Sequence, residues 1–170
     1  MRDETTRVGN HPDRGTQVPP SDFEEGKPHF MTHSETRRTV LFISSGNAVR
    51  SPMAEGFLNA LPSNRYRAAS AGTDPVAIDP MTVEVMKEVG IDLSSHQSLR
   101  AGSIADTPVD FVVTLCERAI KVCPLFAHGS ISFHKAFPEP QTLPEEREAR
   151  LEALREMRDE IRTWVETTFG

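Results

Sequence analysis

The most regular part of the hydrophobic pattern is a continuous apolar run at residues 39–43, Thr-Val-Leu-Phe-Ile. A run without polar alternation is typical of a central parallel strand that is buried on both faces. We interpret three further segments, at residues 66–71, 110–115 and 131–133, as strands. The pattern therefore predicts a sheet of about four strands.

Between these segments, apolar residues recur at the spacing of a helix. Pro52 suits the first position of a helix, and Pro62 sets the point before which that helix ends. Gly90 suits the residue after a helix, where a left-handed backbone conformation is common. The expected helices cover residues 52–61, 79–89, 98–104 and 144–168.

Strands that alternate with helices predict a single doubly wound α/β domain, in which a parallel sheet carries helices on both faces. Ligands of such sheets bind beyond the carboxyl ends of the strands, where the strand order reverses. The segment that follows residue 43 lies at such an end. We therefore expect the functional site there.

The chain of 170 residues suits one domain, but its first part differs from the rest. Residues 1–38 mix both charges with prolines and contain almost no aliphatic side chains. Such a segment buries too little apolar surface to offset the entropy of ordering it, so we expect a disordered tail. Residues 39–170 are expected to form the folded domain, and a product starting at Met31 instead of Met1 would keep all of it.

Composition and charge argue against several classes of protein. Hydrophobic residues make up 37% of the chain, its mean hydropathy is -0.42, and no apolar run approaches the length of a membrane span. The first residues lack the apolar stretch of a secretory signal, so we expect a cytoplasmic protein. A formal net charge of -6 argues against binding to nucleic acid or to acidic membranes. Attraction of an anionic ligand would have to be local.

The chain has two cysteines, Cys116 and Cys123. In a chain without an export signal, a structural disulfide is not the expected interpretation. The two thiols are candidates for core residues, metal ligands or a redox pair. The nearby histidines give no known zinc spacing, so we expect no metal site of that kind.

Residues 44–51, Ser-Ser-Gly-Asn-Ala-Val-Arg-Ser, connect the first strand to the first helix. A tight connection of this kind points successive backbone N–H groups inward above a helix N-terminus and so forms a cradle for an anion. Gly46 allows close backbone approach, and Asn47 tolerates left-handed dihedral angles. Arg50 provides a planar fork that suits a tetrahedral oxyanion. The expected oxyanion-binding residues are Ser45, Gly46, Asn47, Ala48, Val49, Arg50 and Ser51.

The segment at residues 40–58, Val-Leu-Phe-Ile-Ser-Ser-Gly-Asn-Ala-Val-Arg-Ser-Pro-Met-Ala-Glu-Gly-Phe-Leu, resembles the opening of low-molecular-weight protein tyrosine phosphatases. It is more similar to their relatives, the thioredoxin-coupled arsenate reductases. The resemblance continues through residues 70–73, 90–94, 112–116, 123–124 and 137–140. It implies a four-stranded parallel sheet in the order 2-1-3-4, with arsenate, phosphate or a similar oxyanion as the ligand.

The departures from the family pattern concern its chemistry. The family signature is Cys-x5-Arg with the cysteine as nucleophile, and counting back from Arg50 puts Ser44 at that position. Reductases of this branch often carry a second loop cysteine where this chain has Val49. The family acid, an aspartate before a proline, corresponds to Glu139 before Pro140. A serine hydroxyl is far less acidic than a thiol and needs an adjacent general base, which the loop lacks.

Two further sets of residues follow from the resemblance. The spacing of Cys116 and Cys123 matches a pair that relays a disulfide in arsenate reductases, which implies thioredoxin as a partner. In some relatives a monovalent cation binds near the positions of Asn47, Glu55 and Ser70, and no other cofactor is implied.

Two functional interpretations stay open. In the first, the chain is a catalytically impaired pseudoenzyme that senses or sequesters an oxyanion, because Ser44 replaces the nucleophile. In the second, it is an active arsenate reductase, or a tyrosine phosphatase, that uses Cys116 or Ser44. Both interpretations predict an oxyanion in the 44–51 loop, and only turnover separates them.

Overall fold

The computed structural model describes residues 37–126 and 130–170. Its parallel strands form one four-stranded sheet of order β2-β1-β3-β4, which confirms the predicted order. The strands are β1 (Arg38–Ser44), β2 (Tyr66–Gly72), β3 (Phe111–Thr114) and β4 (Ile131–His134). The strand order reverses between β1 and β3, so the loop after β1 lies at the position where such sheets bind ligands.

Helices of two kinds connect these strands. The longer ones are α1 (Arg50–Ala60), α2 (Pro80–Lys87) and α4 (Arg147–Phe169). The shorter ones are α3 (Glu117–Ile120) and the 3₁₀ helices η1 (Ala101–Ile104), η2 (Cys123–Phe126) and η3 (Pro140–Thr142). The sequence did not predict α3 and η2, because a helix of one turn leaves too few positions for a periodic pattern.

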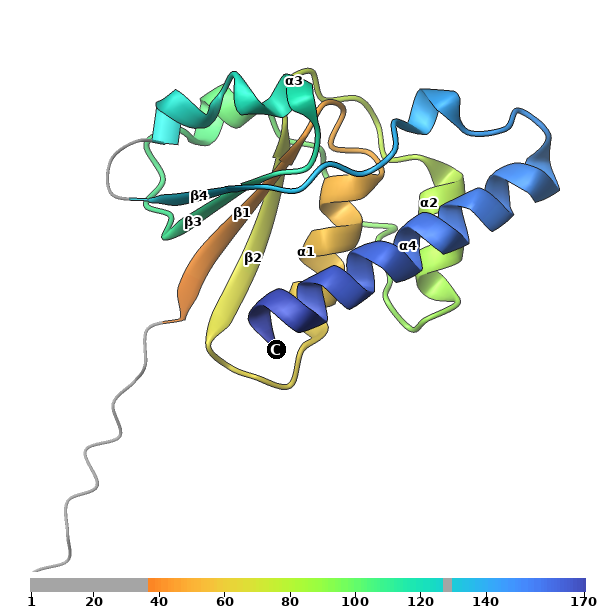
Figure 1. The fold of residues 1–170 in the computed structure, drawn as a ribbon, viewed down its shortest axis with the longest axis horizontal. Helices are drawn as coiled ribbons and strands as arrows, with labels where there is room; N and C mark the ends of the chain where they lie inside the picture. The colour runs from red at the N-terminus through yellow and green to blue at the C-terminus, as the bar shows by residue number, and fades with distance from the viewer. Residues whose placement is uncertain (1–36, 127–129) are drawn as a thin grey trace, which may run out of the picture. The chain divides into compact units, whose positions relative to one another are not determined.

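Both faces of the two central strands, β1 and β3, are buried, and different helices cover them (Figure 1). Val40 and Phe42 of β1 join a large cluster with α1, α2 and α4. Leu41 and Ile43 join a smaller cluster on the other face, formed with η1, α3 and η2. A strand buried on both faces needs apolar residues at every position, which accounts for the continuous run in the sequence. The predicted doubly wound α/β domain is confirmed.

Several predicted boundaries need correction. The first helix begins at Arg50, and Pro52 is its third residue instead of its first. The last helix begins at Arg147 instead of residue 144, because the Glu146 side chain accepts hydrogen bonds from the N–H groups of Glu148 and Ala149, at 3.0 and 2.8 Å. The helix expected at residues 98–104 is limited to η1.

The structure bears on two predictions about the whole chain, the absence of a membrane span and the presence of an N-terminal tail. No helix within the described ranges is both long and apolar enough to cross a bilayer. The tail predicted at residues 1–38 falls almost entirely outside those ranges and stays a prediction. Its last residue, Arg38, is the first residue of β1, so the folded part begins one position earlier than expected.

Candidate functional site

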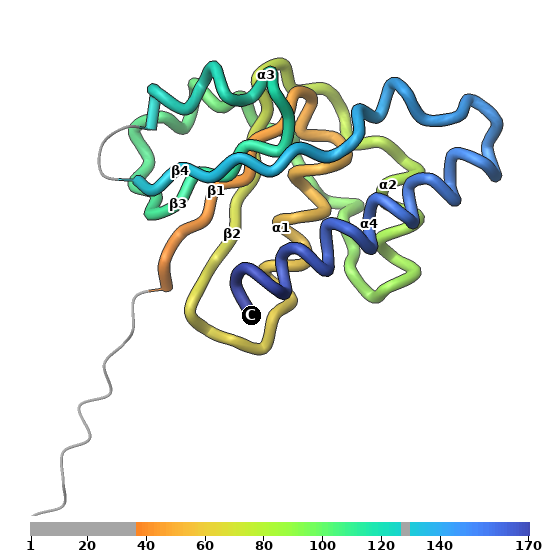
Figure 2. Tube along the Cα trace, viewed as in Figure 1, coloured from red at the N-terminus to blue at the C-terminus, as the bar shows by residue number. Residues whose placement is uncertain are grey.

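The 44–51 loop lies at the carboxyl end of β1, beside the connection that follows β2 (Figure 2). Four loop carbonyl oxygens accept hydrogen bonds of 2.9–3.1 Å from that connection. The pairs are Thr73 N–H to Ser44, Asp74 N–H to Ser45, Val76 N–H to Gly46, and Asp79 N–H to Ala48. These contacts turn the loop carbonyls toward the neighbouring connection.

The N–H groups of the loop behave differently from its carbonyls. Within the described part of the chain, the backbone N–H groups of residues 45–49 donate no hydrogen bond. Most of these residues are buried, and unpaired buried N–H groups cost free energy unless water or a ligand accepts from them. Helix α1 begins at the next residue, so its positive end adds to the same field. The predicted anion cradle therefore has a geometric basis.

Gly72, the last residue of β2, lies close against the loop. A Cβ atom added there would lie 2.8 Å from the carbonyl oxygen of Ser45 and 3.0 Å from the backbone nitrogen of Asn47. Real Cβ atoms do not approach backbone atoms this closely, so only glycine lets the strand and the loop meet. Gly72 therefore allows the close contact between β2 and the loop, and it has no side chain that could take part in a reaction.

Asn47 braces the loop from inside. Its backbone is left-handed, with a φ angle of 50°, and the residue is fully buried. The Nδ2 atom donates to the hydroxyls of Ser51 at 3.0 Å and Ser70 at 2.8 Å. The Oδ1 atom accepts from the N–H of Leu99 at 2.9 Å, and the backbone carbonyl accepts from the Ser98 hydroxyl at 2.8 Å. The sequence predicted the left-handed role of Asn47 but not its partners at residues 98 and 99.

Ser44 ends β1 at the base of the loop and is 2% exposed. Its Oγ lies 2.7 Å from the Oγ of Ser51, which also accepts the hydrogen bond from Asn47. Among the described residues, no carboxylate, imidazole or amine hydrogen-bonds to the Ser44 hydroxyl. The hydroxyl is therefore held by other neutral groups and has no partner that would take its proton.

Arg50 and Glu139 meet, although 89 residues separate them in the sequence. Nη1 and Nη2 of the guanidinium each donate to one carboxylate oxygen of Glu139, both at 3.0 Å. Nη1 also donates to the backbone carbonyl of Phe137 at 3.3 Å. Arg50 is 2% exposed, whereas the Glu139 side chain is 41% exposed. The sequence placed both residues at the site, but it gave no sign that they form an ion pair.

Cys116 is a buried member of the smaller core cluster, Cys123 is a partly buried residue packed against that cluster, and both are free thiols. The Sγ of Cys116, which is 1% exposed, lies 3.2 Å from the hydroxyl of the loop residue Ser45. Burial raises the pKa of the Cys123 thiol, and hydrogen bonds with Thr114 and Ser132 oppose that effect. Cys116 therefore touches the loop, whereas Cys123 packs against the same core cluster.

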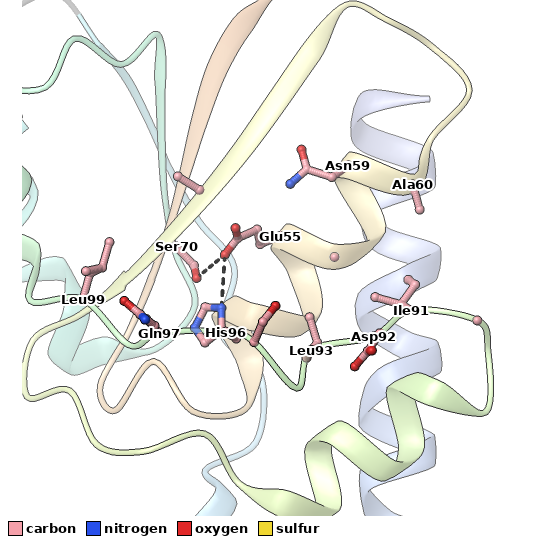
Figure 3. Close-up of a pocket in the computed structure, with 14 residues that line it drawn as sticks. Glu55, Asn59, Ala60, Ser70, Ile91, Asp92, Leu93, His96, Gln97 and Leu99 are labelled. Carbon is pink, nitrogen blue, oxygen red and sulfur yellow. Dashed lines mark hydrogen bonds and ion pairs between the residues drawn. The ribbon is translucent and has the colours of Figure 1, made fainter.

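Two of the three residues expected near a cation, Glu55 and Ser70, line a pocket of about 570 Å³ (Figure 3). Ser70 of β2 donates to a carboxylate oxygen of Glu55 of α1 at 2.5 Å. The Nδ1 atom of His96 lies 3.8 Å from the same oxygen. Because Ser70 also accepts from Asn47, this pocket is connected to the loop through one hydroxyl group.

Comparison with known proteins gives one family and several relatives. Residues 39–166 match the family of low molecular weight phosphotyrosine protein phosphatases. Arsenate reductase 2 of Staphylococcus epidermidis is 35% identical over 131 residues, which are 77% of this chain and 95% of that protein.

Two solved structures are also similar. An arsenate reductase in the phosphate binding state has a TM-score of 0.62 and 27% identity, and the match covers 76% of this chain and 95% of that one. A low molecular weight protein tyrosine phosphatase from T. tengcongensis has a TM-score of 0.64 and 25% identity, with the same two coverages of 76% and 95%. The fold is therefore shared with a reductase and with a phosphatase.

Proposed function

This chain belongs to the low molecular weight phosphotyrosine protein phosphatase family, and on that premise we propose that its 44–51 loop binds arsenate, phosphate or a similar oxyanion. One observation carries the proposal: the backbone N–H groups of residues 45–49 donate no hydrogen bond in the described part of the chain, and Arg50 follows them directly at the start of α1. A similar arsenate reductase is known in a phosphate binding state, which supports the same class of ligand here.

The proposal also states that the loop is catalytically impaired. Ser44 stands where the resemblance places the nucleophilic cysteine, and among the described residues its hydroxyl hydrogen-bonds only to that of Ser51. A thiol in such a loop ionises because amides, a helix terminus and an arginine stabilise its thiolate. A hydroxyl is several pKa units less acidic, and no base lies beside it to remove the proton. Binding survives the change because it depends on the N–H groups and Arg50.

Calorimetry with inorganic phosphate and with arsenate tests the binding half of the proposal. We expect saturable one-site binding to the wild-type protein, and binding weakened about 100-fold or more after Arg50→Ala. The matched control is Arg100→Ala, which removes an exposed arginine near the loop without touching it. Absence of binding to the wild-type protein at millimolar phosphate would overturn the proposal.

Hydrolysis of a small aryl phosphate tests the chemical half. We expect no turnover above background for the wild-type protein. Ser44→Cys should bind phosphate with similar affinity and should release the first equivalent of phenol in a burst, because a cysteine thiolate attacks phosphorus directly. Wild-type turnover that Ser44→Ala abolishes would show instead that the serine is the nucleophile.

The contact between Ser45 and Cys116 favours one second candidate, an active arsenate reductase coupled to thioredoxin. In this reaction two thiols become one disulfide, while arsenate accepts two electrons and becomes arsenite with release of water. Cys116 would add to arsenic, and Cys123 would attack the Cys116 sulfur and expel arsenite. Thioredoxin would then reduce the disulfide by thiol exchange. The expected setting is the cytoplasm, where such reductants keep thiols reduced.

Mass spectrometry and an arsenite assay separate the two candidates. A reductase should produce arsenite in the presence of thioredoxin, should lose that activity in Cys116→Ser, and should retain it in Ser44→Ala. Mild oxidation should also remove two hydrogens from the peptide that contains Cys116 and Cys123. The impaired-loop proposal predicts no arsenite from any of these proteins, so arsenite formation by Ser44→Ala would refute it.

A monovalent cation near Asn47, Glu55 and Ser70 is also part of the proposal. Carboxylate and hydroxyl oxygens suit a hard cation, and Glu55 and Ser70 offer both kinds. Potassium should then raise the melting temperature more than the same ionic strength of a bulky organic cation. Glu55→Gln should remove the difference, whereas an equal shift with both salts would rule out a specific site.

A further inference from the structure

We infer that Glu139, the residue at the family acid position, serves to position Arg50 for the oxyanion and does not donate a proton. This inference rests on the proposed function, because it concerns the same loop. Its geometric basis is the pair of hydrogen bonds from Nη1 and Nη2 of Arg50 to the two oxygens of Glu139, both at 3.0 Å. Bidentate pairs of this kind fix the plane of a guanidinium as well as its charge.

The remaining donors of Arg50 define where an anion can bind. A guanidinium has five N–H donors, two on each terminal nitrogen and one on Nε. The structure uses both donors of Nη1, on Glu139 and the Phe137 carbonyl, and one donor of Nη2. The Nε–H and the second Nη2 donor, which lie along one side of the group, donate to nothing in the described part of the chain.

Arg50 also lines a pocket of about 250 Å³ together with the loop residues Gly46, Ala48 and Val49. Glu139 therefore occupies the end of the fork and leaves a two-donor side open, which matches two oxygens of a tetrahedral anion.

The segment that carries Glu139 is built to hold its carboxylate in place. Pro138 and Pro140 flank it and restrict the backbone on both sides. The Glu139 carbonyl accepts from the N–H of Thr142 at 3.0 Å and from its hydroxyl at 2.7 Å. The N–H of Phe137 is bound in turn to the carbonyl of Leu115 at 3.2 Å, just beyond β3. The pair therefore joins α1 to the segment after β4 through a rigid support.

The same contact argues against a proton donor. A general acid must carry a proton and aim it at the leaving group. In the structure both carboxylate oxygens of Glu139 face the Arg50 guanidinium and accept hydrogen bonds from it, so neither is directed at a leaving group as a donor. A positioning role and an acid role make different predictions, since only the first affects anion binding in a protein without turnover.

Sulfate binding measured by calorimetry tests the positioning role. Sulfate is used because its charge is the same throughout the neutral pH range. Glu139→Gln keeps the size of the side chain but leaves one acceptor, so we expect sulfate affinity to fall about tenfold, as loss of one charge-assisted hydrogen bond would give. The matched control is Glu145→Gln, which removes the same charge from an exposed residue in the same segment. Unchanged or tighter sulfate binding by Glu139→Gln would show that the carboxylate only repels or competes with the anion, and would overturn the inference.

A double-mutant cycle shows whether Glu139 acts through Arg50. Arg50→Lys retains the charge but has no fork for Glu139 to orient. If Glu139 only positions the guanidinium, Glu139→Gln should have no further effect on sulfate affinity in the Arg50→Lys background. Equal losses in both backgrounds would mean that Glu139 acts on the anion by another route, and the inference would fail.

The nitrogen NMR signal of the Arg50 Nε–H separates this inference from the proposed function. The signal is assigned by its loss in Arg50→Lys. In the wild-type protein it should be sharp without any anion, and it should broaden or exchange faster with water in Glu139→Gln but not in Glu145→Gln. A wild-type protein that shows this contrast but binds no sulfate would refute the proposed function and keep the ion pair. Equal signals in all three proteins would refute the positioning role.

Discussion

Two buried arginines of this chain, Arg50 and Arg158, differ in how many of their hydrogen-bond donors are used. Arg50 begins α1 at the loop and is 2% exposed, and Arg158 lies in the middle of α4 and is 7% exposed. Arg158 donates from Nε and Nη2 to Asp159, and from Nη1 to the Val85 carbonyl and to Glu88, at 2.7–3.1 Å. In the described part of the chain, Arg50 donates from Nη1 to Glu139 and the Phe137 carbonyl and from Nη2 to Glu139, and its Nε–H donates to nothing.

The difference separates a structural arginine from a binding one. Arg158 fastens α4 to α2, and its partners use donors along the whole guanidinium. Arg50 is also buried, but within the part of the chain that the structure describes it leaves some donors unused, as do the N–H groups of residues 45–49. A buried charge with unused donors costs stability, so such a site is expected where a ligand completes it. Burial alone would not distinguish the two residues.

The largest expected effect is on ligand binding at the loop. Arg50→Ala should weaken phosphate binding about 100-fold or more, on the order of 3 kcal/mol, because it removes a buried charged donor. The free energy of unfolding should change little, since the partner Glu139 is 41% exposed and can be hydrated. Calorimetry and urea denaturation measure the two quantities. A large loss of stability with unchanged phosphate binding would mean that Arg50 is the structural arginine.

The opposite result is expected at α4. Arg158→Ala should lower the free energy of unfolding by about 2 kcal/mol, because it removes buried hydrogen bonds and leaves the Val85 carbonyl without this donor. Phosphate affinity should stay within about twofold of the wild-type value. Urea denaturation with a phosphate titration on the same samples tests both statements. Weaker phosphate binding in this variant would mean that the α2–α4 contact also supports the loop.

The fold was largely predictable from the sequence, and the site was predictable in part. The run at residues 39–43 indicated a strand buried on both faces, and β1 is such a strand. Asn47 and Arg50 were expected in the loop because their backbone and donor properties are local. The order of the strands came only from the resemblance, since pairing between distant segments leaves no periodic signal.

The contacts that the sequence missed all join distant segments. Glu139 lies 89 residues from Arg50, and Cys116 lies 71 residues from Ser45. Each residue was a candidate because of its position in the family pattern. The sequence around each residue, however, does not indicate that the two members of a pair are in contact. Gly72 left no signal of its own either, because its role is to make room for another segment. Long-range packing decides such contacts, and it is not encoded in any short window of sequence.

A smaller effect is expected from pH on the free energy of unfolding, through the ion pairs around Arg158. Arg155 and Arg158 hold the pKa of Glu88 below its ordinary value, and Arg158 does the same for Asp159. The unfolded chain therefore binds more protons than the folded one near pH 4, so stability is present above the ordinary carboxyl pKa and is lost as pH falls through the lowered values. The destabilisation by Arg158→Ala should then be smaller at pH 3 than at pH 7 in urea denaturation. An equal loss at both pH values would assign the role of Arg158 to packing alone.

The smallest effect is expected for the arginine with the most ionic contacts on the surface. Arg155 makes four hydrogen bonds of 2.8–3.3 Å to Glu88 and Glu152, as many as Arg158 makes in all. Its side chain is 32% exposed, however, and solvent and salt screen exposed pairs. Arg155→Ala should therefore lower the free energy of unfolding much less than Arg158→Ala does, and about as little as Arg162→Ala, whose pair with Glu166 is exposed. If Arg155→Ala costs as much as Arg158→Ala, the number of ionic contacts matters more than burial, and the comparison of the two buried arginines loses its basis.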